Sequence, residues 1–105
     1  MEITIDELRE LCNNKAIRWT AHVMRRLIQR GISRSDVIEA IQRGEIIEQY
    51  QDDYPFPSCL VLGFTIAGKA LHVVCGIGEA EIWIITAYCP NPAEWEDDLK
   101  IRKQV

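Results

Sequence analysis

Two histidines and several arginines are the side chains of this 105-residue chain that could perform acid–base chemistry. His22 and Arg26 are four residues apart, so on a helix they lie one turn apart on the same side, with about 6 Å between their Cβ atoms. His22 falls in the first predicted turn, where the positive end of the helix dipole favours the uncharged imidazole that a general base needs. The alternative interpretation is a solvated basic helix face with a histidine near its start.

The second histidine, His72, lies within a predicted strand, where Leu71 and Val73 point to the opposite face. It is either a catalytic group or a core histidine bonded to a backbone carbonyl, and the sequence leaves both interpretations open. Thr86 and Tyr88 of the next strand share its face only if a one-residue bulge shifts the register.

If His22, Arg26 and His72 converge, they provide the parts of metal-free RNA cleavage. One base takes the proton of a ribose 2′-hydroxyl, that oxygen attacks the phosphorus, and the second histidine protonates the leaving 5′-oxygen. Arg26 stabilises the charge that develops on the phosphate. The further side chains that we expect to bind substrate are cations, a hydroxyl and an aromatic ring: Arg25, Arg30, Thr86, Tyr88 and Arg102.

The charges are segregated along the chain, although the net charge is −4. Residues 15–43 carry seven basic and two acidic side chains, whereas residues 44–54 carry four acids and residues 79–98 carry six acids, with no base in either range. This pattern predicts a basic surface that can meet phosphate and acidic surfaces that can meet a basic partner. The alternative is a charge asymmetry without a function.

Several classes of protein have no support in the sequence. None of the four cysteines (Cys12, Cys59, Cys75, Cys89) belongs to a C-x-x-C pair, so we expect no metal and no cofactor, and the last three read as small buried residues. Paired carboxylates, a phosphate-binding glycine loop and a serine elbow are missing, which argues against glycosidases, kinases and esterases. There is no apolar run of membrane-spanning length and no signal peptide, so we expect a cytoplasmic protein that does not enter the membrane.

Three helices are predicted before residue 45, each from a cap and a stop signal. They span residues 5–13, the stretch between Thr20 and Gly31, and the stretch between Ser33 and Gly44, and Thr4 and Glu7 form a capping box before the first. The second helix carries a predicted buried stripe of Val23, Met24, Leu27 and Ile28.

Four strands are predicted after the helices, at residues 45–50, 59–67, 70–76 and 81–89. The first has the charges of an edge strand, and the last is the most apolar and is expected in a central position. Pro90 and Pro92 end the last strand, and Trp95 is expected to pack back onto the body. Two to three helices packed on one face of an antiparallel sheet of about four strands give a single α+β domain over residues 1–105.

The motifs resemble one known family over almost the whole chain from Trp19 on. They are His22-x-x-x-Arg26-x-x-x-Arg30-Gly31-Ile32-Ser33, Gly44-x-Ile46-Ile47-x-x-Tyr50, Leu71-His72-Val73-Val74, Ile84-Ile85-Thr86-Ala87-Tyr88-x-Pro90 and Trp95…Arg102-Lys103. This combination resembles the bacterial and archaeal family known as domain of unknown function 4258. Val23 and Leu27 depart from the family pattern, where alanine and methionine are common, and both changes are conservative.

The resemblance implies a RelE-type toxin fold, with helices packed on a curved antiparallel sheet. It further implies the toxin of a toxin–antitoxin pair, a metal-independent endoribonuclease that cleaves mRNA, with a small antitoxin, often of zinc-finger type, as its partner. The polar family positions are His22, Arg26, Arg30, His72, Thr86, Tyr88 and Arg102. Two alternatives remain: a non-catalytic module that binds RNA or protein through the basic helix face, and a structural subunit whose histidines are both core residues.

Overall fold

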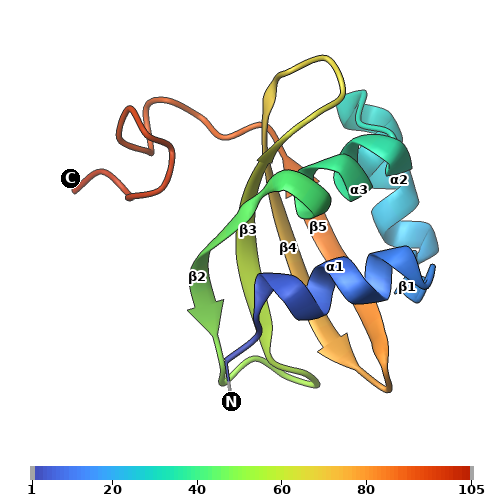
Figure 1. Ribbon diagram of the computed structural model, residues 1–105. Helices are drawn as coiled ribbons and strands as arrows, with labels where there is room; N and C mark the ends of the chain where they lie inside the picture. Colours follow the sequence, from blue (N-terminus) through green and yellow to red (C-terminus); the bar gives the residue numbers. More distant parts are fainter. Residues whose placement is uncertain (1, 105) are drawn as a thin grey trace.

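The computed structural model describes residues 2–104, which form three helices and five strands. Figure 1 shows these elements in chain order: α1 (Ile5–Asn13), β1 (Ile17–Arg18), α2 (Ala21–Arg30), α3 (Arg34–Arg43), β2 (Glu45–Tyr50), β3 (Ser58–Phe64), β4 (Ala70–Gly78) and β5 (Glu81–Tyr88). The fold is α+β, as the order of helical and extended patterns predicts. No helix within residues 2–104 is long and apolar enough to cross a membrane.

The sheet has the order β1-β5-β4-β3-β2 and is antiparallel except at one edge. The exception is β1, which pairs in parallel with β5 through Ile17 and Arg18. The sequence predicts no strand between the first two helices, because a two-residue strand has no periodicity to detect. β5 has a neighbour on each side, as its predicted central position requires, although the strand in the middle of the sheet is β4.

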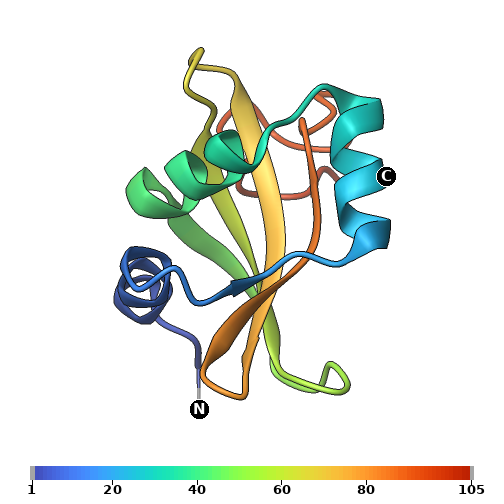
Figure 2. The same cartoon turned by 90° about the vertical axis from the view of Figure 1, so that its right-hand side faces the viewer.

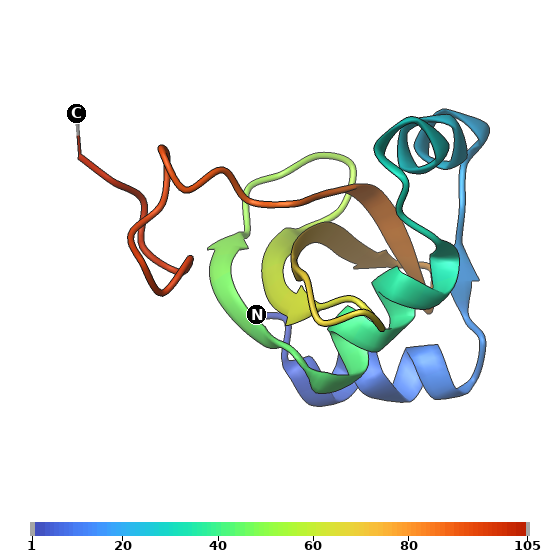
Figure 3. The same cartoon turned by 90° about the horizontal axis from the view of Figure 1, so that it is seen from above.

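The helices occupy two positions around the sheet. Figures 2 and 3 show α1 and α3 together over one face, whereas α2 lies apart from them, beside β5. Val23 and Leu27 of α2 are buried in the same core as the residues of α1, α3 and the sheet. Ile28 is 75% exposed, so the predicted four-residue stripe is wrong there.

Capping residues fix the bounds of α2 and therefore the place of His22. The Thr20 hydroxyl accepts a hydrogen bond from the Val23 N–H at 3.1 Å, which begins the helix. Gly31 ends it in the left-handed conformation, with φ of 67°. The predicted capping box of Thr4 with Glu7 is formed, and Ser33 forms a second one with Asp36 at the start of α3. His22 thus lies in the first turn of α2.

A β-bulge determines which side chains of β5 lie on the same face of the sheet as His72. Cys75 pairs with Ile84, but the preceding residue of β4, Val74, pairs with Thr86. Ile85 is therefore the extra residue in β5. Beyond the bulge His72 lies opposite Tyr88. Of the two registers that the sequence allowed, the bulged one is formed, and His72, Thr86 and Tyr88 share a face. We call it the outer face, because Leu71 and Val73 point the other way into the core.

The chain after β5 folds back over the outer face. Residues 93–104, the C-terminal strap, contain turns and one isolated bridge between Trp95 and Arg102, in place of regular helix or strand. Trp95 is 3% exposed, so its predicted packing onto the body is confirmed. Cys89, which begins this connection, is exposed and not buried as expected, because it lies just beyond the last residue of β5.

Candidate functional site

The solvent side of α2 is a basic surface with free guanidinium groups. His22, Arg25 and Arg26 are exposed, and α2 contains no acidic residue. Within residues 2–104 the side chains of Arg25 and Arg26 form no ion pair and no hydrogen bond with another side chain or the backbone. We call His22, Arg25 and Arg26 the α2 basic face. These three predicted site residues are brought together as expected, and they are open to solvent.

An open groove of about 350 Å³ adjoins the start of α2. His22 forms one side, the loop between β2 and β3 forms another with Tyr54 and Phe56, and Trp83 of β5 contributes from the outer face. Tyr54 is 95% exposed, and the rings of Phe56 and Trp83 are 5.6 Å apart. We call this the aromatic groove. Flat rings beside cations are the combination on which unpaired nucleic-acid bases stack.

The sequence did not assign the aromatic groove, because its walls come from separate parts of the chain. Phe56 packs over Gly78, where an added Cβ would lie 2.4 Å from the ring. Trp83 is held by its indole N–H, which donates to the Gly78 carbonyl at 3.1 Å, and by the Arg18 guanidinium, 4.9 Å from its ring centre. The signal that could have indicated the groove is Tyr54-Pro55-Phe56-Pro57, where two aromatic residues alternate with prolines in a loop.

Arg30 and Thr86, which we expected to bind substrate, form a hydrogen bond with each other. The Arg30 Nη1 donates to the Thr86 hydroxyl at 2.9 Å and to the Ala87 carbonyl at 2.8 Å. These bonds tie the C-terminal turn of α2 to β5. Arg30 therefore positions the helix, and its guanidinium is less available to substrate than those of Arg25 and Arg26.

His72 is sealed beneath the C-terminal strap, with 0% of its surface exposed. Its Nε2 donates to the Leu99 carbonyl at 2.8 Å, and its ring meets those of Trp95 and Tyr88 edge-on, at centre distances of 4.5 and 5.4 Å. His72 does not line the aromatic groove, whereas His22 does. The expectation that both imidazoles open into one hollow with Arg26 is therefore wrong in this structure, and the core-histidine interpretation holds.

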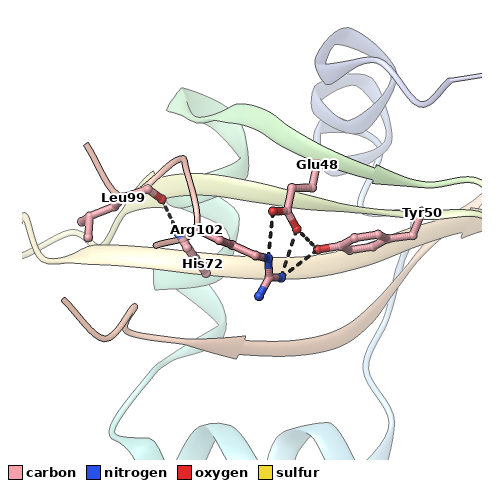
Figure 4. Close-up of polar contacts among 5 residues, drawn as sticks. All are labelled: Glu48, Tyr50, His72, Leu99 and Arg102. Carbon is pink, nitrogen blue, oxygen red and sulfur yellow. Dashed lines mark hydrogen bonds and ion pairs between the residues drawn. The ribbon is translucent and has the colours of Figure 1, made fainter. Parts of the chain in front are cut away.

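Arg102 is also engaged within the protein and does not face solvent as a free cation. Figure 4 shows its guanidinium against Glu48, with Nε 3.0 Å from Oε2 and Nη2 3.1 Å from Oε1. The Tyr50 hydroxyl donates to the same carboxylate, and the guanidinium lies 4.6 Å from the Trp95 ring centre. Arg102 thus holds the strap onto β2 where we expected it to bind substrate.

The charges beside His72 alter the ionisation of this cluster. Burial opposes ionisation of Glu48, but the hydrogen bonds from Arg102 and Tyr50 outweigh it and hold the pKa of the carboxyl below its usual value. Burial, and then the bond to Glu48, raise the pKa of Tyr50 to about 12. Burial lowers the pKa of His72, and Arg102 adds to this, against the opposing effects of the Leu99 carbonyl and Glu48.

We expect the free energy of unfolding to fall as the pH drops below about 6.5, the ordinary pKa of histidine. In that range the unfolded chain binds a proton at residue 72 that the folded chain does not yet bind, so acid favours unfolding, until the pH reaches the lowered pKa. Denaturant unfolding at several pH values, with a His72→Gln variant beside the wild type, measures this. The variant should show a flatter dependence just below pH 6.5, and equal slopes would contradict the assignment.

A family model described as a domain of unknown function (DUF4258) matches residues 19–89. The chain belongs to this family. No curated protein and no solved structure matches it. The matched range of this DUF4258 protein contains His22, the α2 basic face and the whole outer face of β4 and β5, but it ends before Trp95 and Arg102. The C-terminal strap therefore lies outside the matched domain.

The predicted site residues of this DUF4258 protein fall into two groups. The first is exposed, on the α2 basic face beside the aromatic groove. The second consists of His72, Tyr88 and Arg102 under or within the strap, with Glu48 and Tyr50 as partners that sequence reasoning did not assign. Arg30 and Thr86 bind each other between α2 and β5. Only the first group can meet a substrate in the structure as it stands.

Proposed function

We propose that this protein acts on RNA as the toxin of a toxin–antitoxin pair, and that it binds single-stranded RNA across the α2 basic face and the aromatic groove. The observation that carries the proposal is the position of His22. It is exposed, it belongs to the α2 basic face, and it also lines the groove with Tyr54 and Trp83. An imidazole thus stands where a phosphate on the helix and a base in the groove would meet.

The binding would combine charge with stacking. Arg25 and Arg26 have no competing partner in the described chain, so they are free to meet phosphates. Stacking of a base on an aromatic side chain contributes roughly 1–3 kcal/mol, and it requires a base that is not already paired. The net charge of −4 opposes RNA elsewhere on the molecule. The proposed affinity is therefore local to this surface and strongly dependent on salt.

Cleavage would use His22 as the general base and need no metal. The imidazole takes the proton of a 2′-hydroxyl, the 2′-oxygen forms its bond to phosphorus, and the 5′-oxygen leaves. Arg26, one turn along α2, faces the charge that develops on the phosphate. Because His72 is sealed, the leaving oxygen would take its proton from water. General-base catalysis by His22 would contribute about 10²–10⁴ to the rate.

The RelE-type fold implied by the family motifs is part of this proposal. Its support is the α+β architecture with α1 and α3 over an antiparallel sheet. A small antitoxin, often of zinc-finger type in such pairs, would be the protein partner. One fold can host many activities, so the activity and its residues are argued from the α2 basic face itself.

A second candidate function is RNA binding without cleavage, and the burial of His72 favours it. Two exposed acid–base groups at one phosphate are the usual requirement for efficient metal-free cleavage. Of the two histidines, only His22 is exposed.

The test is incubation of a labelled single-stranded RNA with the pure protein, with and without EDTA. We expect slow cleavage that survives EDTA and that falls by about 10²–10⁴ in a His22→Gln variant, while RNA binding is retained. Gln29→Ala, at another exposed position of α2, is the matched control and should cleave like the wild type. Binding without cleavage would support the second candidate. Cleavage that needs a metal, or that is undiminished in His22→Gln, would contradict the mechanism.

A further inference from the structure

We propose that the C-terminal strap is a displaceable cover, and that lifting it adds the outer face around His72 to the RNA-binding surface. The proposal rests on the proposed function, and it assigns a regulation to it. In the closed structure RNA would reach only the α2 basic face and the aromatic groove. With the strap lifted, the same RNA would continue along β4 and β5.

The strap can move as a unit, because its backbone hydrogen bonds are internal apart from one that the Glu94 N–H donates to the adjacent Asn91 carbonyl. The Glu96 N–H donates to the Ile101 carbonyl, the Leu99 N–H to the Glu96 carbonyl, and the Lys103 N–H to the Glu94 carbonyl. The one bond from a strap carbonyl to the sheet runs from Leu99 to the His72 side chain. Lifting the strap therefore breaks no strand pairing of the five-stranded sheet.

The attachments of the strap to the body are few, and its two ion pairs lie at the surface. Trp95 is the only fully buried side chain between residues 93 and 104. The remaining contacts are the bond between Leu99 and His72 and the ion pairs of Arg102 with Glu48 and of Lys100 with Glu45, whose cations are 60% and 44% exposed. The exposed Lys100 pair adds little stability, whereas Arg102 contacts the mostly buried Glu48 carboxylate through two nitrogens, so Trp95 and Arg102 hold most of the strap. Such a segment opens more readily than the rest of the fold.

The cover leaves a polar atom of His72 without a partner. Since the Leu99 carbonyl accepts from Nε2, the neutral ring carries its proton there and Nδ1 is a bare acceptor. Within residues 2–104 the buried Nδ1 has no hydrogen-bond partner. A buried acceptor left unpaired costs free energy in the closed state. Lifting the strap removes this cost, because Nδ1 can then accept from water or from a ligand.

The uncovered surface would be continuous with the aromatic groove. His72, Val74 and Gly76 follow one another along the outer face of β4, and Gly76 already lines the groove. The distance along the strand from His72 to Gly76 is about 13 Å. Thr86 of β5 lies opposite Val74, between the two ends. A short single strand of RNA that begins at His22 on α2 could therefore follow the outer face of the sheet to His72.

The chemistry of this uncovered surface suits RNA better than the closed surface does. The strap carries four carboxylates, Glu94, Glu96, Asp97 and Asp98, and carboxylates repel phosphate. Without the strap, the ring of Tyr88 can stack a base and His72 can bond a phosphate or a base. Figure 4 shows Glu48 bonded to both Arg102 and Tyr50. When the strap lifts, Glu48 would lose the bond to Arg102 and keep the bond to Tyr50. Its carboxylate can then accept from the amino group of a cytosine.

The test uses the full chain with a loosened strap, in an Arg102→Ala variant and in a Trp95→Ala/Arg102→Ala double variant. Lys103→Ala is the control, because it changes an exposed strap cation for which the structure shows no side-chain contact. Carbethoxylation of His72 by diethyl pyrocarbonate, measured by mass spectrometry, reports opening, and exposed His22 is the internal reference. We expect at least a tenfold faster reaction at His72 in the double variant, a smaller increase in Arg102→Ala, and no change in Lys103→Ala.

RNA affinity, measured on the same proteins with a labelled single strand, completes the test. The double variant should bind at least tenfold more tightly than the wild type, and adding His72→Ala should remove most of the gain. A His72 that stays protected in a folded double variant overturns the cover. A His72 that reacts while RNA affinity stays at the wild-type level overturns the second contact, but the α2 site survives. RNA binding that is undetectable in every protein overturns the proposed function and the RNA role of the outer face, whereas the reactivity of His72 still decides whether the strap opens.

Discussion

Replacing Arg25 and Arg26 together by glutamate should lower the affinity for single-stranded RNA by about a hundredfold at physiological salt. Both guanidinium groups are exposed and have no partner within residues 2–104, so the change removes two phosphate contacts and adds two repulsive charges. The fold should not be affected, because neither side chain contributes to the core. Fluorescence anisotropy over a range of salt concentrations measures the effect. The slope of log affinity against log salt should become shallower by roughly 1.4, or 0.7 for each phosphate lost.

The matched control is Lys69→Glu with Lys103→Glu, which makes the same change in net charge at exposed positions away from α2. We expect this control to lose only a few-fold in affinity, through the general repulsion of a more acidic protein. If both double variants lost affinity equally, the binding would depend on net charge alone. The α2 basic face would then have no special role.

The helices could be predicted from sequence because their signals are local. Thr20, Gly31 and the capping box of Ser33 with Asp36 act within one turn of the residues that they cap. They place His22, Arg25 and Arg26 correctly on the exposed side of α2. This part of the candidate site therefore follows from a short stretch of sequence without tertiary information.

The burial of His72 could not be predicted, because it depends on residues more than 20 positions away. Alternation along β4 places the ring on the outer face correctly, but the pattern does not say that Trp95 and Leu99 fold back over it. The register that brings Tyr88 beside it depends on one bulge at Ile85. The period of two along each strand allows this register and its alternative equally.

The segregation of charge along the chain does not carry over fully to the surface. Segregation along the chain predicts separate basic and acidic surfaces, yet several of the segregated charges pair with each other in space. Arg18 pairs with Glu81 at 2.8 Å, and the basic tail pairs with β2 through Lys100 with Glu45 and Arg102 with Glu48. Arg25 and Arg26 remain without such partners in the described chain. Lys15 and Arg34 are likewise exposed and have no such partner in the described chain, so the unpaired basic charge is smaller than the range 15–43 suggests and α2 carries part of it.

Gly63→Ala should destabilise the protein by about 3 kcal/mol, because β3 and α3 leave no room for a methyl group there. A Cβ at residue 63 would lie 2.3 Å from the Ala40 carbonyl oxygen and 2.5 Å from the Ala40 Cα. These are backbone atoms, so no rotamer change relieves the clash and α3 must move away from the sheet. Thermal and denaturant unfolding should both show the loss.

The control for Gly63→Ala is Gly31→Ala at the end of α2, where no atom lies within 4 Å of the added Cβ but φ is +67°. It should cost only about 1–2 kcal/mol, the price of a side chain in the left-handed region. A loss at Gly63 no larger than this would mean that α3 can shift on the sheet without penalty. Ile32 lies in the connection between α2 and α3, Val37 lies in α3, and both are buried in one core. A shift of α3 should therefore also displace the α2 basic face. Gly63→Ala should therefore weaken RNA binding as well as the fold, whereas Gly31→Ala should weaken binding only slightly.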